Sequence, residues 1–443
     1  MSNNENNEIR DSFTSKTGFI LACIGSAVGM GNIWLFPYRV GQFGGAAFLI
    51  PYIIFIVLLG YTGLMGEFAF GRMTQTGPIG SFKKALETKN KNWGGFLGII
   101  PVVGAFGIAV GYAVVVGWFL RFLGGFITGS AMSAADSGAY FGELASPFGS
   151  IIWHLLALIL VSIVLISGIS KGIETMNKIM MPAFYILFVI VMVRVFMLDG
   201  AFEGIKYLVV PKWSSLMEPK TWIYALGQAF FSLSLAGSGM IVYGSYLKRD
   251  VDIMSSAKNT VIFDTLGAFL AGLVIIPAVF AFNLDPASGP PLLFITIPSV
   301  FKLMPFGRLF GVIFFISVLF ASITSLMNLL EVPIEAVQST FKLKRKLSVF
   351  IVVGAAFIFG LFAEDGNNLG VLMDFVSIYI IPIGAFIAAV MFFWVIGIEK
   401  AKYEIECGTD KKLGKLFEIS AKYVFVFLTI FVFIAGILLG GIG

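Results

Sequence analysis

Three carboxylates stand out among those inside the long apolar segments of this sequence, where a charge is costly. They are Glu67, Asp264 and Asp374. An acid in a membrane helix is unfavourable by about 2.5–3.5 kcal/mol on insertion scales, and such acids usually mark functional positions. Asp264 therefore predicts a cation ligand or a proton site. Glu67 is equally compatible with a functional part of this kind and with accepting hydrogen bonds from unwound backbone.

Two apolar segments are interrupted by small residues. The first interruption reads GSAVGMGN over residues 25–32, and the second reads SLSLAGSGM over residues 232–240. Glycine disfavours helix, and backbone groups that are freed at membrane depth persist only where they line a cavity or contact protein. Close helix packing through small residues explains either segment alone. Together the two segments predict a pair of broken helices.

A broken helix offers two kinds of end. The half-helix that starts near Met30 and Gly31 directs free N–H groups into the gap, which suits a carboxylate. The halves that end near Ala27 and Ser232 offer carbonyl oxygens, which suit a small cation or an ammonium group. Oxygen ligands of this kind bind hard cations without histidine or thiolate. Further side-chain oxygens near the breaks are those of Asn32, Ser232, Ser234, Thr324 and Ser325.

The elements that carry these residues are membrane helices. The 443 residues are 58% hydrophobic and 12% charged, and the mean hydropathy is +0.95. Soluble domains average about 45–50% apolar and about 25% charged residues. Eleven stretches are apolar enough to cross a bilayer as helix, which predicts an all-α integral membrane protein. These spans are 18–39, 44–70, 96–126, 150–168, 173–197, 220–246, 258–282, 305–336, 347–363, 368–397 and 417–441.

The interrupted spans are the first and the sixth. Because they are five spans apart, a second five-helix unit starts from the opposite side of the membrane. The sequence therefore predicts a 5+5 inverted repeat whose discontinuous helices place a site near the bilayer midplane. In this division, residues 1–17 form a cytoplasmic segment and residues 18–397 form the core of membrane spans. The core comprises repeat one (18–197) and repeat two (220–397), and residues 398–443 hold a cytoplasmic loop and the eleventh helix.

Basic residues fall in alternate loops. The opposite loop over residues 128–149 contains no Lys or Arg. The positive-inside rule then predicts a multi-pass protein of the plasma membrane, with a cytoplasmic N-terminus and an extracellular C-terminus. The basic side is defined by Lys83, Lys84, Lys89, Lys91, Lys171, Lys178, Lys248, Arg249, Lys342, Lys344, Arg345, Lys346, Lys411, Lys412 and Lys415.

Several function classes fit this sequence poorly. The single histidine, His154, and the two cysteines, Cys23 and Cys407, supply no transition-metal site and no catalytic cluster, which argues against an enzyme. A channel requires a continuous polar pore, whereas the polar groups here converge on one region. Nothing indicates nucleic acid as a partner. The oligomeric state is not predicted.

Long motifs in the same order resemble the neurotransmitter:sodium symporter family, in its bacterial eleven-helix amino-acid transporter branch with a LeuT-like fold. The resemblance covers essentially the whole chain. It implies an alternating-access symporter driven by the sodium gradient. The motifs are GSAVGMGNIWLFPYRVGQFGGAAF, MGEFAFGR, SGISKGIE, LGQAFFSLSL and ASITSLMNLLEVP.

The resemblance also implies the site residues. Two sodium ions are expected, with the substrate carboxylate completing the first sodium site. That site comprises Ala27, Asn32, Ser232 and Asp264. The second site comprises Gly25, Val28, Ala321, Thr324 and Ser325. The substrate would contact Ala27, Met30, Gly31, Ile108, Tyr112, Phe231, Ser232, Ser234, Gly237, Leu326 and Leu329.

The gates depart from the family pattern. The gate residues that the resemblance implies are Arg39, Asp374, Gln228, Arg10 and Phe13. Leu35 occupies the position of the outer-gate arginine, so Arg39, one turn further on, is the candidate to replace it. At the inner gate, Ser339 occupies the position of the acidic partner on the eighth span.

Two further expectations concern selectivity. Asp264 stands where Asn is common, and its fixed negative charge predicts transport that does not require chloride. Gly237 stands where relatives can carry Phe, which predicts space for a large hydrophobic or aromatic amino acid such as tyrosine or tryptophan. The alternatives are a symporter for an aliphatic amino acid and a non-transporting membrane sensor of the same fold.

Overall fold

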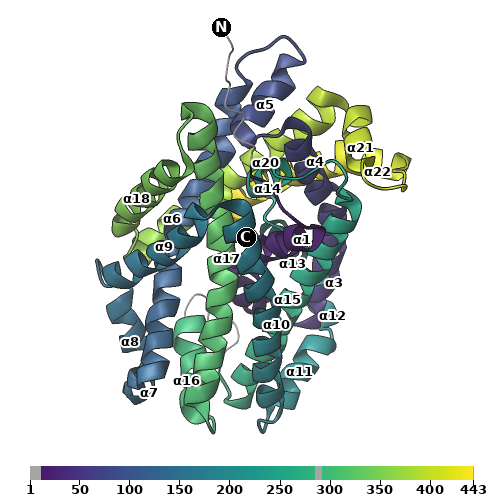
Figure 1. Cartoon of the computed structure of the whole chain (residues 1–443). Coiled ribbons are helices and arrows are strands. Elements are labelled where there is room, and N and C mark those ends of the chain that lie inside the picture. Colours follow the sequence, from purple (N-terminus) through teal and green to yellow (C-terminus); the bar gives the residue numbers. More distant parts are fainter. Residues whose placement is uncertain (1–10, 285–291, 443) are drawn as a thin grey trace.

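The computed structural model describes residues 11–284 and 292–442. This part of the chain consists of helices and connecting turns, without a strand. The long helices α6, α10 and α17 run side by side along the molecule, with α7, α8, α11 and α16 at one end and α5, α21 and α22 at the other (Figure 1). The fold is therefore all-helical, as predicted.

The longer helices of the first half overlap the predicted spans, and short helices lie between them. The first predicted span comprises α1 (Lys16–Ala27), η1 (Gly31–Leu35) and α2 (Phe36–Gln42), where η denotes a π-helical segment. The following elements are α3 (Ala46–Leu59), η2 (Gly60–Leu64), α4 (Met65–Thr74), α5 (Pro78–Glu87), α6 (Gly94–Thr128), α7 (Ser130–Ser133), α8 (Ser137–Leu144), α9 (Ile151–Ile166), η3 (Ile169–Glu174), α10 (Thr175–Phe196), α11 (Ala201–Val209) and α12 (Trp213–Leu216).

The second half repeats the pattern of a divided helix followed by long ones. Its first predicted span comprises α13 (Pro219–Ser232) and α14 (Gly239–Ser245). The following elements are α15 (Ile253–Ala281), η4 (Leu292–Thr296), α16 (Ile297–Leu303), α17 (Gly307–Phe341), α18 (Arg345–Phe362), α19 (Gly366–Phe375), η5 (Val376–Ile380), α20 (Ile381–Val390), η6 (Met391–Gly397), α21 (Ile398–Glu406), α22 (Lys415–Ile419), η7 (Ser420–Phe425) and α23 (Val426–Leu439).

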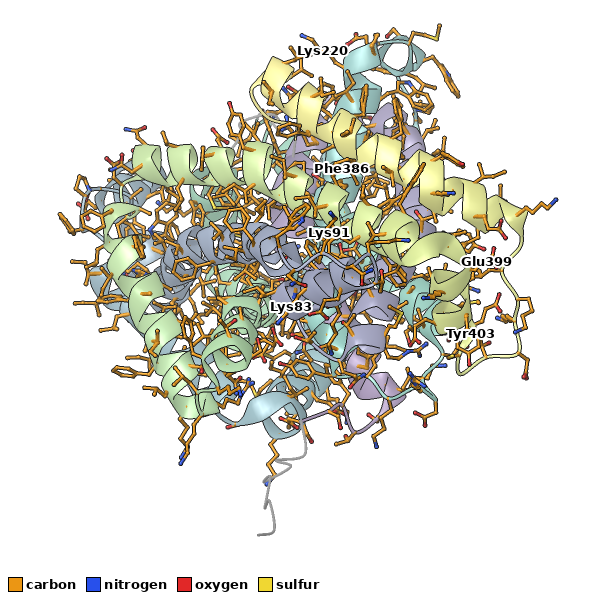
Figure 2. All side chains as sticks on the ribbon, turned by 90° about the horizontal axis from the view of Figure 1, so that it is seen from above. Lys83, Lys91, Lys220, Phe386, Glu399 and Tyr403 are labelled. Atoms are coloured by element: carbon orange, nitrogen blue, oxygen red, sulfur yellow. The ribbon has the colours of Figure 1, made fainter. Side chains whose placement is uncertain are left out.

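Eight helices among the described residues are long and apolar enough to cross a membrane, and the bent pair Lys16–Ala27 and Gly31–Gln42 makes a ninth. The predicted fourth span is a shorter apolar helix of 16 residues, Ile151–Ile166. The predicted sixth span is divided between α13 and α14. Seen from above, side chains project from the outer helices around the whole molecule (Figure 2), and many are exposed apolar groups such as Ile186, Phe359 and Leu438. A lipid-facing surface explains such exposure.

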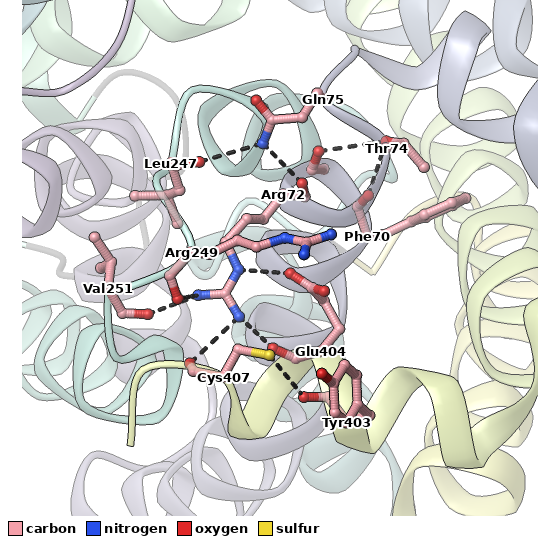
Figure 3. A network of polar contacts seen from close by, with 11 residues as sticks. Phe70, Arg72, Thr74, Gln75, Leu247, Arg249, Val251, Tyr403, Glu404 and Cys407 are labelled. Atoms are coloured by element: carbon pink, nitrogen blue, oxygen red, sulfur yellow. Dashed lines mark hydrogen bonds and ion pairs between the residues drawn. The ribbon is translucent and has the colours of Figure 1, made fainter.

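A buried arginine joins three segments at the end of the molecule that carries α5 and α21. Arg72 on α4 forms an ion pair with Glu404 on α21, with Nε and Oε1 2.7 Å apart. It also donates to the backbone carbonyls of Glu404 and, at 2.6 Å, Val251 (Figure 3). Because Arg72 is buried, these contacts satisfy a charge that would otherwise be uncompensated. They fix α4, α21 and the turn before α15 to one another.

Candidate functional site

The first helix break lies between α1 and η1. The chain bends there by 51°, and Val28 leaves the helix with extended backbone angles. The amide N–H of Met30 donates to the Tyr112 hydroxyl at 2.8 Å. Gln228 on α13 donates to the carbonyl of Gly31 at 2.9 Å. The freed backbone groups of this break are thus partly satisfied by neighbouring helices, as membrane burial requires.

The second break lies between Ser232, where α13 ends, and Gly239, where α14 begins. The chain turns through left-handed backbone at Ser234 (φ 53°) and Gly237 (φ 65°). The carboxylate of Glu67 accepts a hydrogen bond from the Gly237 amide at 2.9 Å. Of the two roles considered for Glu67, support of unwound backbone is the one that the geometry favours.

Asp264 joins both breaks. Its Oδ1 accepts from the Asn32 amide at 2.8 Å, and its Oδ2 accepts from the Ser232 hydroxyl at 2.8 Å. The Tyr52 hydroxyl lies 3.4 Å from Ser232 Oγ. Asp264, Asn32 and Ser232 are all buried. Four residues from four spans therefore form one oxygen-rich cluster, and Tyr52 is a member that the sequence reasoning missed.

A second oxygen cluster joins α17 to the first break. The Ser325 hydroxyl donates to the carbonyls of Gly25 at 3.0 Å, Ser26 at 3.2 Å and Val28 at 3.2 Å. Beside it, the Thr324 hydroxyl donates to the Ala321 carbonyl of its own helix at 2.9 Å. The members implied for the second sodium site thus lie together, and their donor set of carbonyls and hydroxyls suits a hard monovalent cation.

A cavity of about 70 Å³ lies between the breaks, α6 and α17. Of the residues implied for the substrate, eight line it: Ala27, Met30, Gly31, Ile108, Tyr112, Phe231, Ser234 and Leu329. Ser232 and Leu326 are buried beside this lining and are not part of it. The cavity also has polar members that the sequence reasoning did not name, Ser26, Ser238 and Asn328.

Gly237 does not line this cavity, which corrects the expectation that it leaves space for a substrate ring. A Cβ atom on Gly237 would lie 2.5 Å from the Gly384 carbonyl oxygen and 2.9 Å from Ala388 Cβ. The position therefore faces α20 and not the space between α13 and α17. Its glycine is explained by the positive φ and by this close approach of two backbones.

A larger hollow of about 510 Å³ adjoins the cavity and shares Met30, Gly31, Tyr112, Phe230 and Phe231 with its lining. It lies on the side of α19. Both proposed outer-gate residues, Arg39 and Asp374, line it. No ion pair joins them within the described part of the chain. The Arg39 guanidinium instead lies 4.4 Å from the ring centre of Tyr224 and donates to Gln42 at 3.0 Å.

The opposite side of the cavity is packed. Phe13 is buried and makes edge-on contacts with Phe19 (5.2 Å between ring centres) and Tyr243 (5.6 Å). Arg10, the other inner-gate candidate, lies outside the described residues. Ser339 donates to the Ala336 carbonyl of its own helix at 3.3 Å.

The charged contact on this side was missed by the sequence reasoning. Arg345 makes two hydrogen bonds to Glu331, at 2.9 and 2.7 Å, and Tyr246 donates to the same carboxylate at 2.8 Å. Glu331 lies inside the predicted eighth span and is fully buried. The reasoning that singled out Asp264 applies equally to this residue, so the signal was present in the sequence.

The chain matches a known protein family. A family model described as the sodium:neurotransmitter symporter family matches residues 10–132 and 141–439. The sodium-dependent transporter YhdH of Bacillus subtilis, described as uncharacterized, is 36% identical over 432 residues and is matched over 94% of both chains. The sodium-dependent serotonin transporter of Drosophila melanogaster is 28% identical, over 96% of this chain and 76% of its own length.

A solved structure is similar over almost the whole chain. The crystal structure of MhsT in complex with L-phenylalanine superposes with a TM-score of 0.87 at 35% identity. The match covers 96% of this chain and 100% of that one. The fold of the chain is therefore that of a LeuT-type transporter.

Proposed function

This chain belongs to the sodium:neurotransmitter symporter family and is a sodium-dependent symporter, and we propose that it carries an amino acid into the cell by alternating access. The observation that carries this proposal is the juxtaposition of the cavity with two oxygen clusters. One cluster surrounds Asp264, and the other surrounds Ser325. Both clusters involve the backbone or side chains of the first helix break.

The two clusters are proposed as two sodium sites. Around Asp264, the Asn32 and Ser232 side chains and the Ala27 carbonyl are the protein ligands. Around Ser325, the ligands are the carbonyls of the break together with the hydroxyls of Thr324 and Ser325. Hydroxyls that donate to carbonyls when no ion is bound can turn their oxygen lone pairs toward an ion, because a hydroxyl rotates freely.

The substrate is proposed to bind by its backbone groups at the same breaks. Tyr112 accepts a hydrogen bond from Met30, which leaves its O–H free to donate to a carboxylate. The N–H groups near Gly31 lie at the start of a helical segment and favour the same negative charge. A carboxylate held there would also complete the Asp264 site, so that substrate and sodium stabilise each other's binding. That mutual stabilisation is the physical basis of coupling.

Transport is proposed to be independent of chloride. Asp264 is buried, and its hydrogen-bond partners within the described residues are the neutral Asn32 and Ser232 side chains. A sodium ion in this cluster would compensate its charge. A chloride ion bound beside it would be repelled by the carboxylate at close range.

A large hydrophobic or aromatic amino acid, such as tyrosine or tryptophan, is the proposed substrate. The cavity is lined by Ile108, Phe230, Phe231, Leu235 and Leu329 among other apolar groups, and it has no charged member within the described residues. A charged substrate side chain would therefore be unpaired. The similar protein MhsT was crystallised with L-phenylalanine, which supports an aromatic substrate over the aliphatic alternative.

The architecture proposed for this function has eleven spans, in two inverted repeats over residues 18–197 and 220–397. The N-terminus lies in the cytoplasm and the C-terminus outside, in the plasma membrane. The hollow lined by Asp374 then opens outward, and the packed region around Glu331 closes the inner side. This arrangement corresponds to a carrier closed toward the cytoplasm.

The test is uptake of labelled amino acids by the purified protein in proteoliposomes, with and without an inward sodium gradient. We expect accumulation of aromatic amino acids only with sodium outside. Sodium-dependent binding without accumulation would identify the protein as a sensor of the same fold. The absence of both binding and uptake over a full amino-acid panel would refute the proposed substrate class.

A further inference from the structure

A buried amide in the cavity has a poorly satisfied donor. Asn328 on α17 is 3% exposed, and its side chain lines the cavity. Within the described part of the chain, its Nδ2 makes no hydrogen bond of good geometry, and the Tyr243 hydroxyl is the nearby group that interacts with it. A buried donor without an acceptor is destabilising, because it has lost its hydrogen bonds to water. A bound group that carries a hydrogen-bond acceptor would satisfy this amide.

The amide lies beyond the groups that would hold the substrate backbone. Ser325, which contacts the first break, precedes Asn328 by three residues on α17. Three residues advance a helix by about 4.5 Å along its axis. Gly239 packs directly against this amide, and a Cβ atom there would overlap Asn328 Oδ1. Glycine at this first position of α14 thus leaves room for the amide beside the cavity.

We propose that Asn328 forms a hydrogen bond with the distal end of the substrate side chain. The site would therefore select an aromatic amino acid with an oxygen at that end, and would prefer tyrosine to phenylalanine. This inference rests on the proposed function. The phenol hydroxyl would accept from Nδ2, and the ring would contact the apolar lining that includes Leu329 and Val332. Phenylalanine would leave the buried amide unpaired, which is how a site built for a hydroxyl rejects its deoxy analogue.

The Tyr243 hydroxyl is the competing partner. It lies close enough to the amide to interact with it, and it is buried. If Asn328 served only to hold Tyr243, then removing either group would have the same consequence for substrate choice. The two residues can therefore be separated by experiment.

The experiment compares tyrosine and phenylalanine as competitors of sodium-dependent uptake in proteoliposomes. It uses the native protein, Asn328→Leu, Asn328→Ser and Tyr243→Phe. We expect the native protein to prefer tyrosine. Asn328→Leu should reduce that preference by about tenfold, equivalent to about 1.4 kcal/mol, because tyrosine loses its partner and phenylalanine no longer leaves an amide unpaired. Asn328→Ser has too short a side chain to reach the same group, so it should show the same loss. Tyr243→Phe should retain the preference.

Three results would overturn the inference. One is a native protein that does not favour tyrosine, and another is an unchanged preference in either Asn328 variant. The third is an equal loss of preference in Tyr243→Phe. Each differs from failure of the proposed function, in which the native protein would transport neither amino acid with sodium.

Discussion

Removal of the two hydroxyls of the second proposed sodium site should weaken sodium coupling by a predictable amount. In the structure, Ser325 donates to the carbonyls of Gly25 and Val28 at 3.0 and 3.2 Å, and Thr324 donates to its own helix. A hydrogen bond between neutral groups contributes about 1 kcal/mol net, and one to a charged partner about 1.5–3 kcal/mol. The difference, about 1 kcal/mol for each hydroxyl, is what Thr324→Val with Ser325→Ala would remove from sodium binding.

About 2 kcal/mol in total corresponds to a rise of about 30-fold in the sodium concentration for half-maximal uptake. The measurement is uptake of a labelled aromatic amino acid in proteoliposomes over a series of external sodium concentrations. Ser322→Ala is the matched control, because Ser322 is buried on the same helix and donates only to the Val318 carbonyl, at 2.7 Å, in the described structure. If the double variant has the same sodium dependence as this control, the assignment of the second site is wrong.

Three more outcomes are expected. Replacement of chloride by gluconate should leave native uptake unchanged, whereas Asp264→Asn should abolish uptake or make it depend on chloride; collapse of native uptake in gluconate would contradict the fixed-charge argument. Gly237→Ala should destabilise the protein in detergent by about 2 kcal/mol or more, because a positive φ and the contact with α20 both disfavour a side chain. An unchanged melting temperature would refute this. Glu404→Gln should destabilise the fold by about 3–5 kcal/mol by leaving Arg72 without its counter-ion, whereas Glu203→Gln, at an exposed pair, should change stability by less than about 1 kcal/mol.

The helix breaks could be predicted from the sequence because their signal is local. Gly and Ser runs at Gly25–Asn32 and near Ser232 disfavour helix wherever they occur, and the structure ends α1 and α13 at these runs. No local sequence signal predicts that Thr324 and Ser325 contact the first break, because they lie about 300 residues away along the chain. This grouping came from resemblance, since which face of one helix meets another depends on packing that spacing alone does not determine. The structure brings these groups together.

The sequence could not predict which neighbouring element position 237 faces. The resemblance placed it in the cavity, but within an unwound segment the backbone angles follow neither a helical nor a strand period. The φ of 65° turns the position toward Gly384. Neighbouring residues Ala236 and Ser238 line the cavity instead. We therefore expect substrate size to depend on lining groups such as Ile108 and Leu329 and not on position 237.

At the proposed inner gate, Glu331 supplies the acidic group that the resemblance had led us to look for at position 339. In the proposed orientation the region around Glu331 closes the cytoplasmic side, and such a gate would need a contact that is stable when buried and that water can separate. A bidentate pair between Glu331 and Arg345 meets this requirement, because its charges compensate each other when buried and are well solvated when exposed. The pair joins α17 to the start of α18, and Tyr246 adds the segment that follows α14. Three segments are thereby held by one carboxylate, so the serine at position 339 does not leave this side without an ion pair.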